Sequence, residues 1–165
     1  MVLTAAMIHE GGHLLALKLL GVRDCKFRLS SFGAVLRTED LRLSYLQEIF
    51  AVLAGPAANL ICGAALTSAS SAVPAAAAPA GAHWSLGIFN LLPAAPLDGW
   101  RVLQLFLCWV LGPERGECAA GIIGAAAALL LSGGILFLIF FSGGNLWLLP
   151  MAIWLSVTGV RSVTE

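Results

Sequence analysis

Residues 49–66 read IFAVLAGPAANLICGAAL, an apolar stretch without a charged side chain. It belongs to a longer uncharged region between Glu48 and Asp98, and a second uncharged region lies between Glu117 and Arg161. Uncharged apolar runs of 18 or more residues are typical of transmembrane helices. The two regions therefore predict a chain that is embedded in a lipid bilayer.

The composition of the 165-residue chain agrees with this prediction. Hydrophobic residues make up 59% of it and charged residues 11%, and its mean hydropathy is +0.92. A soluble domain usually carries about 25% charged residues. This composition excludes a disordered chain, a nucleic-acid-binding surface and an ordinary cytosolic enzyme. The four cysteines form no CxxC motif, so we expect no disulfide framework.

We expect an all-α polytopic membrane protein with about five transmembrane helices, one of them broken. Residues 1–165 would form a single domain, with a core at 4–111 and a C-terminal helix pair at 118–162. Ser44 and Gln47 have the spacing of a helix capping box, and Pro93 and Pro96 interrupt the third span. The five spans are expected at residues 4–20, 44–66, 83–111, 118–141 and 146–160.

The connecting segments differ in kind. We expect a low-complexity Ala/Ser/Pro loop at residues 67–82, a short charged turn at 112–117 and a tight turn at 142–145. Residues 22–40 are rich in basic side chains, and polar and apolar residues alternate at 26–29. We expect a small β-hairpin at the membrane face there, with a solvated basic loop as the alternative.

The basic residues all fall on one side of the membrane when the chain crosses it in the five predicted spans. One side receives all nine basic residues, which are Lys18, Arg23, Lys26, Arg28, Arg37, Arg42, Arg101, Arg115 and Arg161. The positive-inside rule makes that side cytoplasmic. We therefore expect a multi-pass cell-membrane protein whose C-terminus and basic loops are cytoplasmic.

The first predicted span contains the motif HEGGH at residues 9–13. Residues four apart share one face of a helix, so His9 and His13 can bind one Zn²⁺ ion. Glu10 would flank the metal in the general-base position of a metalloprotease. Gly11 and Gly12 would leave room for a substrate backbone. A chance match is the alternative, but two histidines and a glutamate in lipid need polar partners.

A catalytic zinc ion normally has a third protein ligand, for which His83 and Asp98 are the candidates. Asp98 lies in the segment NLLPAAPLDG at residues 90–99, whose two prolines should unwind the third span. Unwound backbone at membrane depth is tolerated where it lines a cavity in the protein. We expect a broken helix that delivers Asp98 to a buried site. The alternative is a proline kink with Asp98 paired to Arg101, and an interfacial role is favoured for His83.

The second span contains AGPAAN at residues 54–59. Asn59 offers an amide inside the membrane. It could hold a substrate strand or stabilise an oxyanion, and it could equally form an interhelical hydrogen bond.

Together, HEGGH, AGPAAN and NLLPAAPLDG resemble the motifs of the site-2 protease family of intramembrane metalloproteases. The match covers residues 4–101 and is nearest to the sporulation factor IVFB branch. The resemblance implies that His9, His13 and Asp98 ligate one zinc ion per chain and that Glu10 activates the water. Asn59 and Asn90 would assist around the scissile peptide, and the hairpin region would help to position the substrate.

The function that follows is an intramembrane zinc metalloendopeptidase active in regulated intramembrane proteolysis. The resemblance implies membrane-bound or membrane-associated substrates such as pro-sigma or anti-sigma factors. One alternative is a catalytically inactive metal-binding membrane protein, either a pseudoprotease or transporter-like. Another is a purely structural subunit. Glu10 favours the hydrolase, since a transport site has no need of a carboxylate beside the two histidines.

Members of that branch have a span before the HExxH helix, and many carry a C-terminal CBS domain. Only eight residues precede His9 in this sequence, which stops at Glu165. We therefore expect a second copy of the chain or another partner to cover the flank of the first helix, or the sequence to be a fragment.

Overall fold

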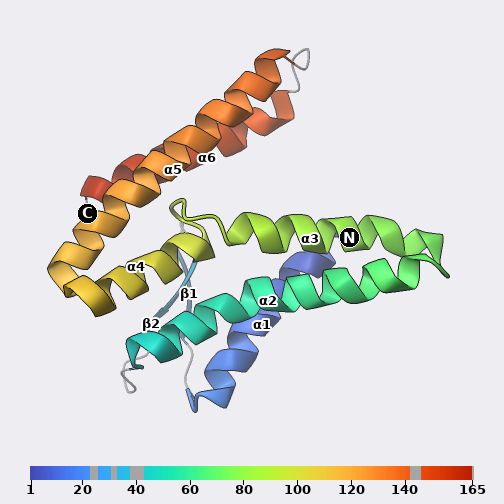
Figure 1. Ribbon diagram of the computed structural model, residues 1–165, viewed down its shortest axis with the longest axis horizontal. Helices are drawn as coiled ribbons and strands as arrows, with labels where there is room; N and C mark the ends of the chain where they lie inside the picture. The colour runs from blue at the N-terminus through green and yellow to red at the C-terminus, as the bar shows by residue number, and fades with distance from the viewer. Residues whose placement is uncertain (23–25, 31–32, 38–42, 142–145, 165) are drawn as a thin grey trace. The chain divides into compact units, whose positions relative to one another are not determined.

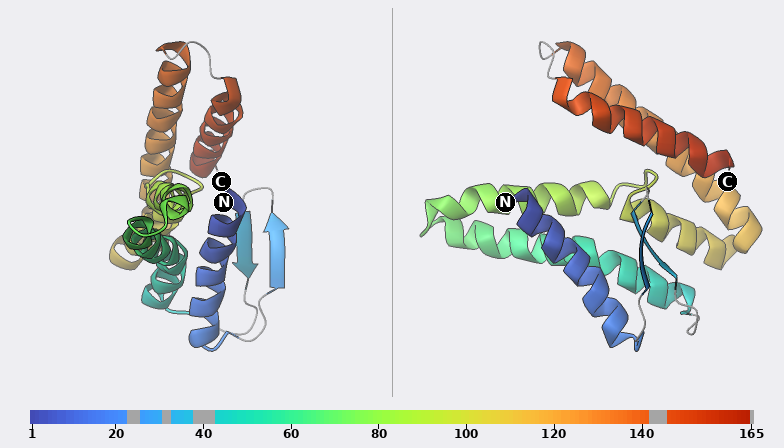
Figure 2. Two further views of the ribbon diagram at one scale, coloured as in Figure 1. Left: turned by 90° about the vertical axis from the view of Figure 1, so that its right-hand side faces the viewer. Right: turned by 180° about the vertical axis from the view of Figure 1, so that it is seen from behind.

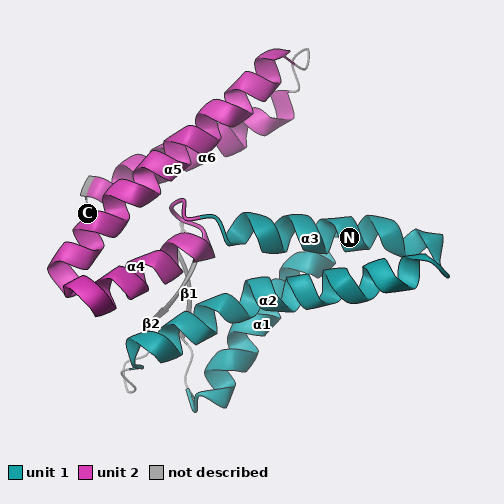
Figure 3. Ribbon diagram, viewed as in Figure 1, with its two compact units in different colours: residues 1–28, 34–92 teal, residues 29–33, 93–165 magenta. Residues whose placement is uncertain are grey.

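The computed structural model describes the whole chain except residues 23–25, 31–32, 38–42, 142–145 and 165 (Figures 1 and 2). Its elements are α1 (Val2–Leu19), β1 (Lys26–Ser30), β2 (Gly33–Arg37), α2 (Tyr45–Ser70), η1 (Pro74–Ala76), α3 (Ala77–Asn90), α4 (Asp98–Leu111), α5 (Pro113–Phe141), η2 (Leu146–Leu148) and α6 (Leu149–Thr164). They form two compact units (Figure 3). One unit contains residues 1–28 and 34–92, and the other contains residues 29–33 and 93–165.

Three segments among the described residues are long and apolar enough to cross a membrane: Tyr45–Ser70, Pro113–Phe141 and Leu146–Val163. Large apolar side chains point outward along α5, where Leu130 is 78% and Phe140 is 84% exposed. Contiguous apolar surface of this kind is rare on a soluble monomer and suits contact with lipid. These features indicate a helical membrane protein, while the number of five spans stays a prediction.

In the first unit, α2 packs against both α1 and α3 (Figure 2). The predicted capping box at the start of α2 is confirmed. The Gln47 backbone N–H donates to Ser44 Oγ at 3.4 Å, and the Ser44 backbone N–H donates to Gln47 Oε1 at 2.9 Å. Two backbone donors that a helix start leaves unpaired are satisfied in this way.

The predicted loop at residues 67–82 is wrong at both ends. Helix α2 continues to Ser70 and α3 already begins at Ala77. The alanines are strong helix formers, and Pro74 and Pro79 stand in first turns, where a missing N–H costs no hydrogen bond. Low complexity therefore did not mean an irregular loop here.

The other two predicted turns have different outcomes. The turn expected at 112–117 is reduced to Gly112, which has a positive φ of 86° and separates α4 from α5. Pro113 then occupies the first position of α5, where proline is favoured. The turn expected at 142–145 lies outside the described residues.

The interruption predicted in the third span is confirmed. Helix α3 ends at Asn90 and α4 begins at Asp98, with residues 91–97 between them. Each helix has 14 residues, or about 21 Å at about 1.5 Å per residue. That length is short of the roughly 30 Å hydrocarbon core of a bilayer, so neither helix spans it alone.

The second unit holds the segment before Asp98 firmly. Ala94, Ala95 and Leu97 are buried. The Thr158 hydroxyl on α6 lies 3.3 Å from the Ala95 carbonyl oxygen and 2.8 Å from the Trp154 carbonyl oxygen of its own helix, so its single proton is shared between them. Helix α5 packs against both α4 and α6. The backbone that carries Asp98 is therefore part of a packed core.

Strands β1 and β2 pair in a two-stranded sheet. They occupy the basic segment for which a hairpin is predicted. The residues of its turn, 31 and 32, lie outside the described part of the chain. The position of this sheet at a membrane face stays a prediction.

Candidate metal centre

Helix α1 presents His9 and His13 one turn apart, and their Nε2 atoms lie 3.2 Å from one another. His9 is buried and His13 is half-buried. Two nitrogen ligands at about 2.0–2.1 Å from a tetrahedral zinc ion lie about 3.3 Å apart. The separation and the donor atoms therefore fit two ligands of one zinc ion.

The His13 ring is held by its other nitrogen. Nδ1 lies 2.9 Å from the carbonyl oxygen of Ala51 on α2, and a carbonyl can only accept. The proton of the neutral ring is thus on Nδ1, and the Nε2 lone pair is available to a metal. Gly55, one turn further along α2, makes room for the ring, because a Cβ there would lie 2.5 Å from His13 Cε1.

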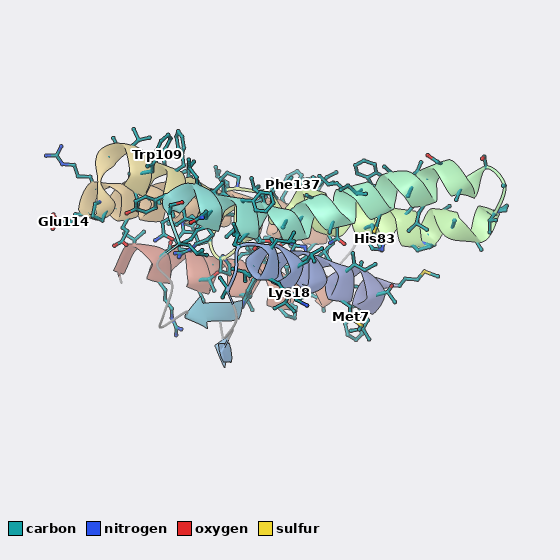
Figure 4. The ribbon with its side chains drawn as sticks, turned by 90° about the horizontal axis from the view of Figure 1, so that it is seen from below. Met7, Lys18, His83, Trp109, Glu114 and Phe137 are labelled. Carbon is teal, nitrogen blue, oxygen red and sulfur yellow. The ribbon has the colours of Figure 1, made fainter. Side chains whose placement is uncertain are left out.

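The His9 ring is held by a chain of buried side chains. Its Nδ1 lies 3.2 Å from Asn59 Nδ2 on α2. Asn59 Oδ1 in turn lies 2.9 Å from Nδ1 of His83 on α3, which Figure 4 labels. Asn59 is 0% and His83 is 3% exposed, so neither amide nor imidazole faces lipid or water.

The interfacial role favoured for His83 is therefore wrong, because its ring is packed inside the first unit and bonded to Asn59. For Asn59, the structure shows the interhelical hydrogen bond that the sequence left open. One sequence signal pointed to His83: an ionisable residue inside an uncharged span needs a polar partner. No local pattern indicated that this partner is Asn59.

The two glycines of HEGGH have different surroundings. A Cβ on Gly12 would lie 2.5 Å from the Ala54 carbonyl oxygen, whereas no contact within 4 Å is found for a Cβ on Gly11 in the part of the chain that the structure describes. Gly12 thus allows α1 and α2 to approach closely. The interpretation that Gly12 leaves room for a substrate is not supported, since α2 fills that space.

Replacing Gly12 with alanine is expected to destabilise the protein by about 1–3 kcal/mol, because the new methyl group meets rigid backbone. Gly11→Ala is the matched control, and it should stabilise the helix by up to about 1 kcal/mol. Thermal unfolding in detergent, followed by circular dichroism, measures both. Equal melting temperatures for the two variants would contradict this packing.

The remaining predicted site residues are Glu10, Asn90 and Asp98. Glu10 follows His9 on α1, and its side chain is exposed. Asn90 is half-buried, and its Nδ2 donates to the Leu86 carbonyl at 3.0 Å within α3. Asp98 is the half-buried first residue of α4 in the second unit. The roles of these three residues stay predictions.

Comparisons with known proteins agree with this chemistry. No family model matches the chain. The chain is 30% identical to Rip3 of Mycobacterium tuberculosis, and the match covers 96% of this chain and 42% of Rip3. The name of Rip3 describes it as a proposed zinc metalloprotease. It is 29% identical to the zinc metalloprotease MJ0392 of Methanocaldococcus jannaschii, over 77% of this chain and 39% of that protein.

A solved structure extends the comparison to the fold. The site-2 protease from Methanocaldococcus jannaschii matches with a TM-score of 0.70 at 24% sequence identity, over 98% of this chain and 75% of that chain. The chain spans about two fifths of the length of the curated relatives, at 42% of Rip3 and 39% of MJ0392. It thus has the fold of a site-2 protease, and its sequence is similar to those of proteins named zinc metalloproteases.

Proposed function

We propose that this chain is a membrane-embedded zinc metalloendopeptidase of the site-2 protease family. One observation carries the proposal: His9 and His13 bring their Nε2 atoms to 3.2 Å while the second nitrogen of each ring is hydrogen-bonded. Metal-ligating histidines in known sites donate their second N–H group in this way, and the bond from His13 Nδ1 to the Ala51 carbonyl is of this kind. The fold and the names of the relatives support the same chemistry.

We assign one zinc ion per chain to His9, His13 and Asp98. Two imidazoles and a carboxylate form a donor set that zinc accepts in hydrolases, with a fourth position left open. When bound, zinc lowers the pKa of water and polarises the carbonyl of a peptide bond. Asp98 is suited to be the third ligand, because a packed backbone holds it at the break between α3 and α4.

The protein's own residues would then carry the proton transfers. Glu10 accepts a proton from the attacking water and donates it to the leaving amine. Asn90, at the end of α3, is proposed to hold the substrate backbone near the scissile bond. The amide of Asn59 already bonds His9 and His83, which favours a supporting role for it.

The substrate class and the topology complete the proposal. The substrate would be a membrane-bound or membrane-associated regulatory protein of the pro-sigma or anti-sigma class, as in the sporulation factor IVFB branch. The basic loops and the C-terminus would be cytoplasmic, in a cell-membrane protein with about five spans. A second copy or another partner would cover the flank of α1.

Zinc content tests the proposed centre directly. Purified wild-type protein in detergent should carry about one zinc ion per chain, and Asp98→Ala should lose most of it, since a catalytic site needs three protein ligands. Glu114→Ala is the control, because Glu114 is an exposed carboxylate in the first turn of α5. Mass spectrometry of metals measures all three. A folded wild-type protein without zinc would contradict the proposed function.

A further inference from the structure

We propose that His83 is a positioning residue of the zinc centre and that it acts on His9 through Asn59. The inference rests on the proposed function, since it requires that His9 binds the metal. It assigns a task to the one histidine that lies outside the HEGGH motif. That task is to keep the His9 proton on Nδ1, so that Nε2 can bind zinc.

The three side chains form one continuous chain across three helices. His83 on α3 lies 2.9 Å from Asn59 on α2, and Asn59 lies 3.2 Å from His9 on α1. Gly87, one turn after His83, lets α3 approach this part of α2, because a Cβ there would lie 3.3 Å from Asn59 Cβ. The packing of α2 and α3 therefore supports the contact between His83 and Asn59.

The amide of Asn59 decides which nitrogen of His9 carries the proton. As the amide is placed, Nδ2 faces His9 and donates to Nδ1, and the proton of the neutral ring then lies on Nε2. If the Asn59 amide is flipped, its Oδ1 faces His9 and accepts from the His9 Nδ1–H group. The Nε2 atom of His9 then presents a lone pair. Only this second orientation allows Nε2 to bind a metal.

His83 stabilises the second orientation of the Asn59 amide. When Oδ1 faces His9, the Asn59 NH₂ group faces His83 and needs an acceptor. Asn59 and His83 are 0% and 3% exposed, so water does not replace that acceptor. A neutral imidazole can accept at Nδ1, whereas an apolar side chain would leave a buried N–H group unsatisfied at a large cost.

The zinc affinity of His83 variants tests this inference. His83→Leu is expected to weaken zinc binding about 10- to 100-fold, the usual effect of losing an outer hydrogen bond to a ligand. His83→Asn should restore binding close to the wild-type level, because its amide lies near the position of the imidazole Nδ1. His83→Gln carries the same amide one methylene further out and should restore less. Competition of Zn²⁺ with a chelator, in detergent, measures each affinity.

A second pair of variants keeps the inference testable if His83→Leu does not fold. Asn59→Asp offers only acceptor oxygens and should keep zinc affinity at the wild-type level or above it. Asn59→Leu offers no acceptor and should weaken binding about 10- to 100-fold. Equal losses in both Asn59 variants would overturn the inference.

The outcomes also separate this inference from the proposed function. If His9→Ala abolishes zinc binding but His83→Leu binds zinc like the wild type, only the positioning role is wrong. If the wild type binds no zinc, or if His9→Ala binds it unchanged, the proposed function fails and the inference fails with it.

Discussion

Replacing Glu10 with glutamine is expected to slow peptide-bond cleavage about 100- to 10,000-fold, the range for removal of a general acid–base catalyst. Glutamine has nearly the same shape as glutamate, but it cannot accept the proton of the attacking water. Zinc content should stay at the wild-type level, because the proposed ligands are His9, His13 and Asp98. Incubation with a pool of single-span model peptides in micelles, read by mass spectrometry, gives the cleavage rate.

The control for Glu10 is Glu114→Gln, which removes an exposed carboxylate from α5 and should cleave at the wild-type rate. Wild-type cleavage by Glu10→Gln would contradict the proposed mechanism. Loss of zinc from the same variant would show that Glu10 is a ligand. A zinc-loaded wild type that cleaves none of the peptides would favour the inactive metal-binding protein.

Gly55→Ala is expected to weaken zinc binding by at least about 100-fold, the upper end of the effect of outer-shell changes. The new methyl group would lie 2.5 Å from His13 Cε1, so the ring must leave its place. The ring is the tip of a side chain and can swing away, so the fold should survive while the proposed ligand His13 is displaced. Chelator competition gives the affinity, and circular dichroism reports the fold.

The matched control for Gly55 is Gly63→Ala on the same helix. The nearest atoms to its Cβ would be those of the Trp84 indole at 3.2 Å, and none of them belongs to His9 or His13. Its zinc affinity should equal that of the wild type. A Gly55→Ala protein that binds zinc as tightly as Gly63→Ala would show that His13 does not occupy the observed position.

Local signals in the sequence predicted the helix that carries HEGGH, the capping box at Ser44 and the break before Asp98. Each depends on residues within a few positions of one another, through helical periodicity, capping or proline sterics. The alanine-rich segment at 67–82 was misjudged, because low complexity was given more weight than helix propensity.

The surroundings of the two histidines could not be predicted in the same way. Asn59 and His83 are 24 positions apart and meet only because α2 and α3 pack in one particular register. Gly55 has no local signature that links it to His13, which lies on another helix. These contacts are tertiary, and no periodicity along the chain encodes them.

The hydrogen bond from His13 to Ala51 has a consequence for genetics. The acceptor is a main-chain oxygen, so it persists whatever side chain stands at that position. A mutational scan should rank substitutions at Ala51 by size alone, because this residue is 5% exposed and packed. The same scan should rank substitutions at Asn59 by polarity. Two positions that support the proposed ligands His9 and His13 would then show different tolerance patterns, and only Asn59 would be recognised as part of the proposed centre.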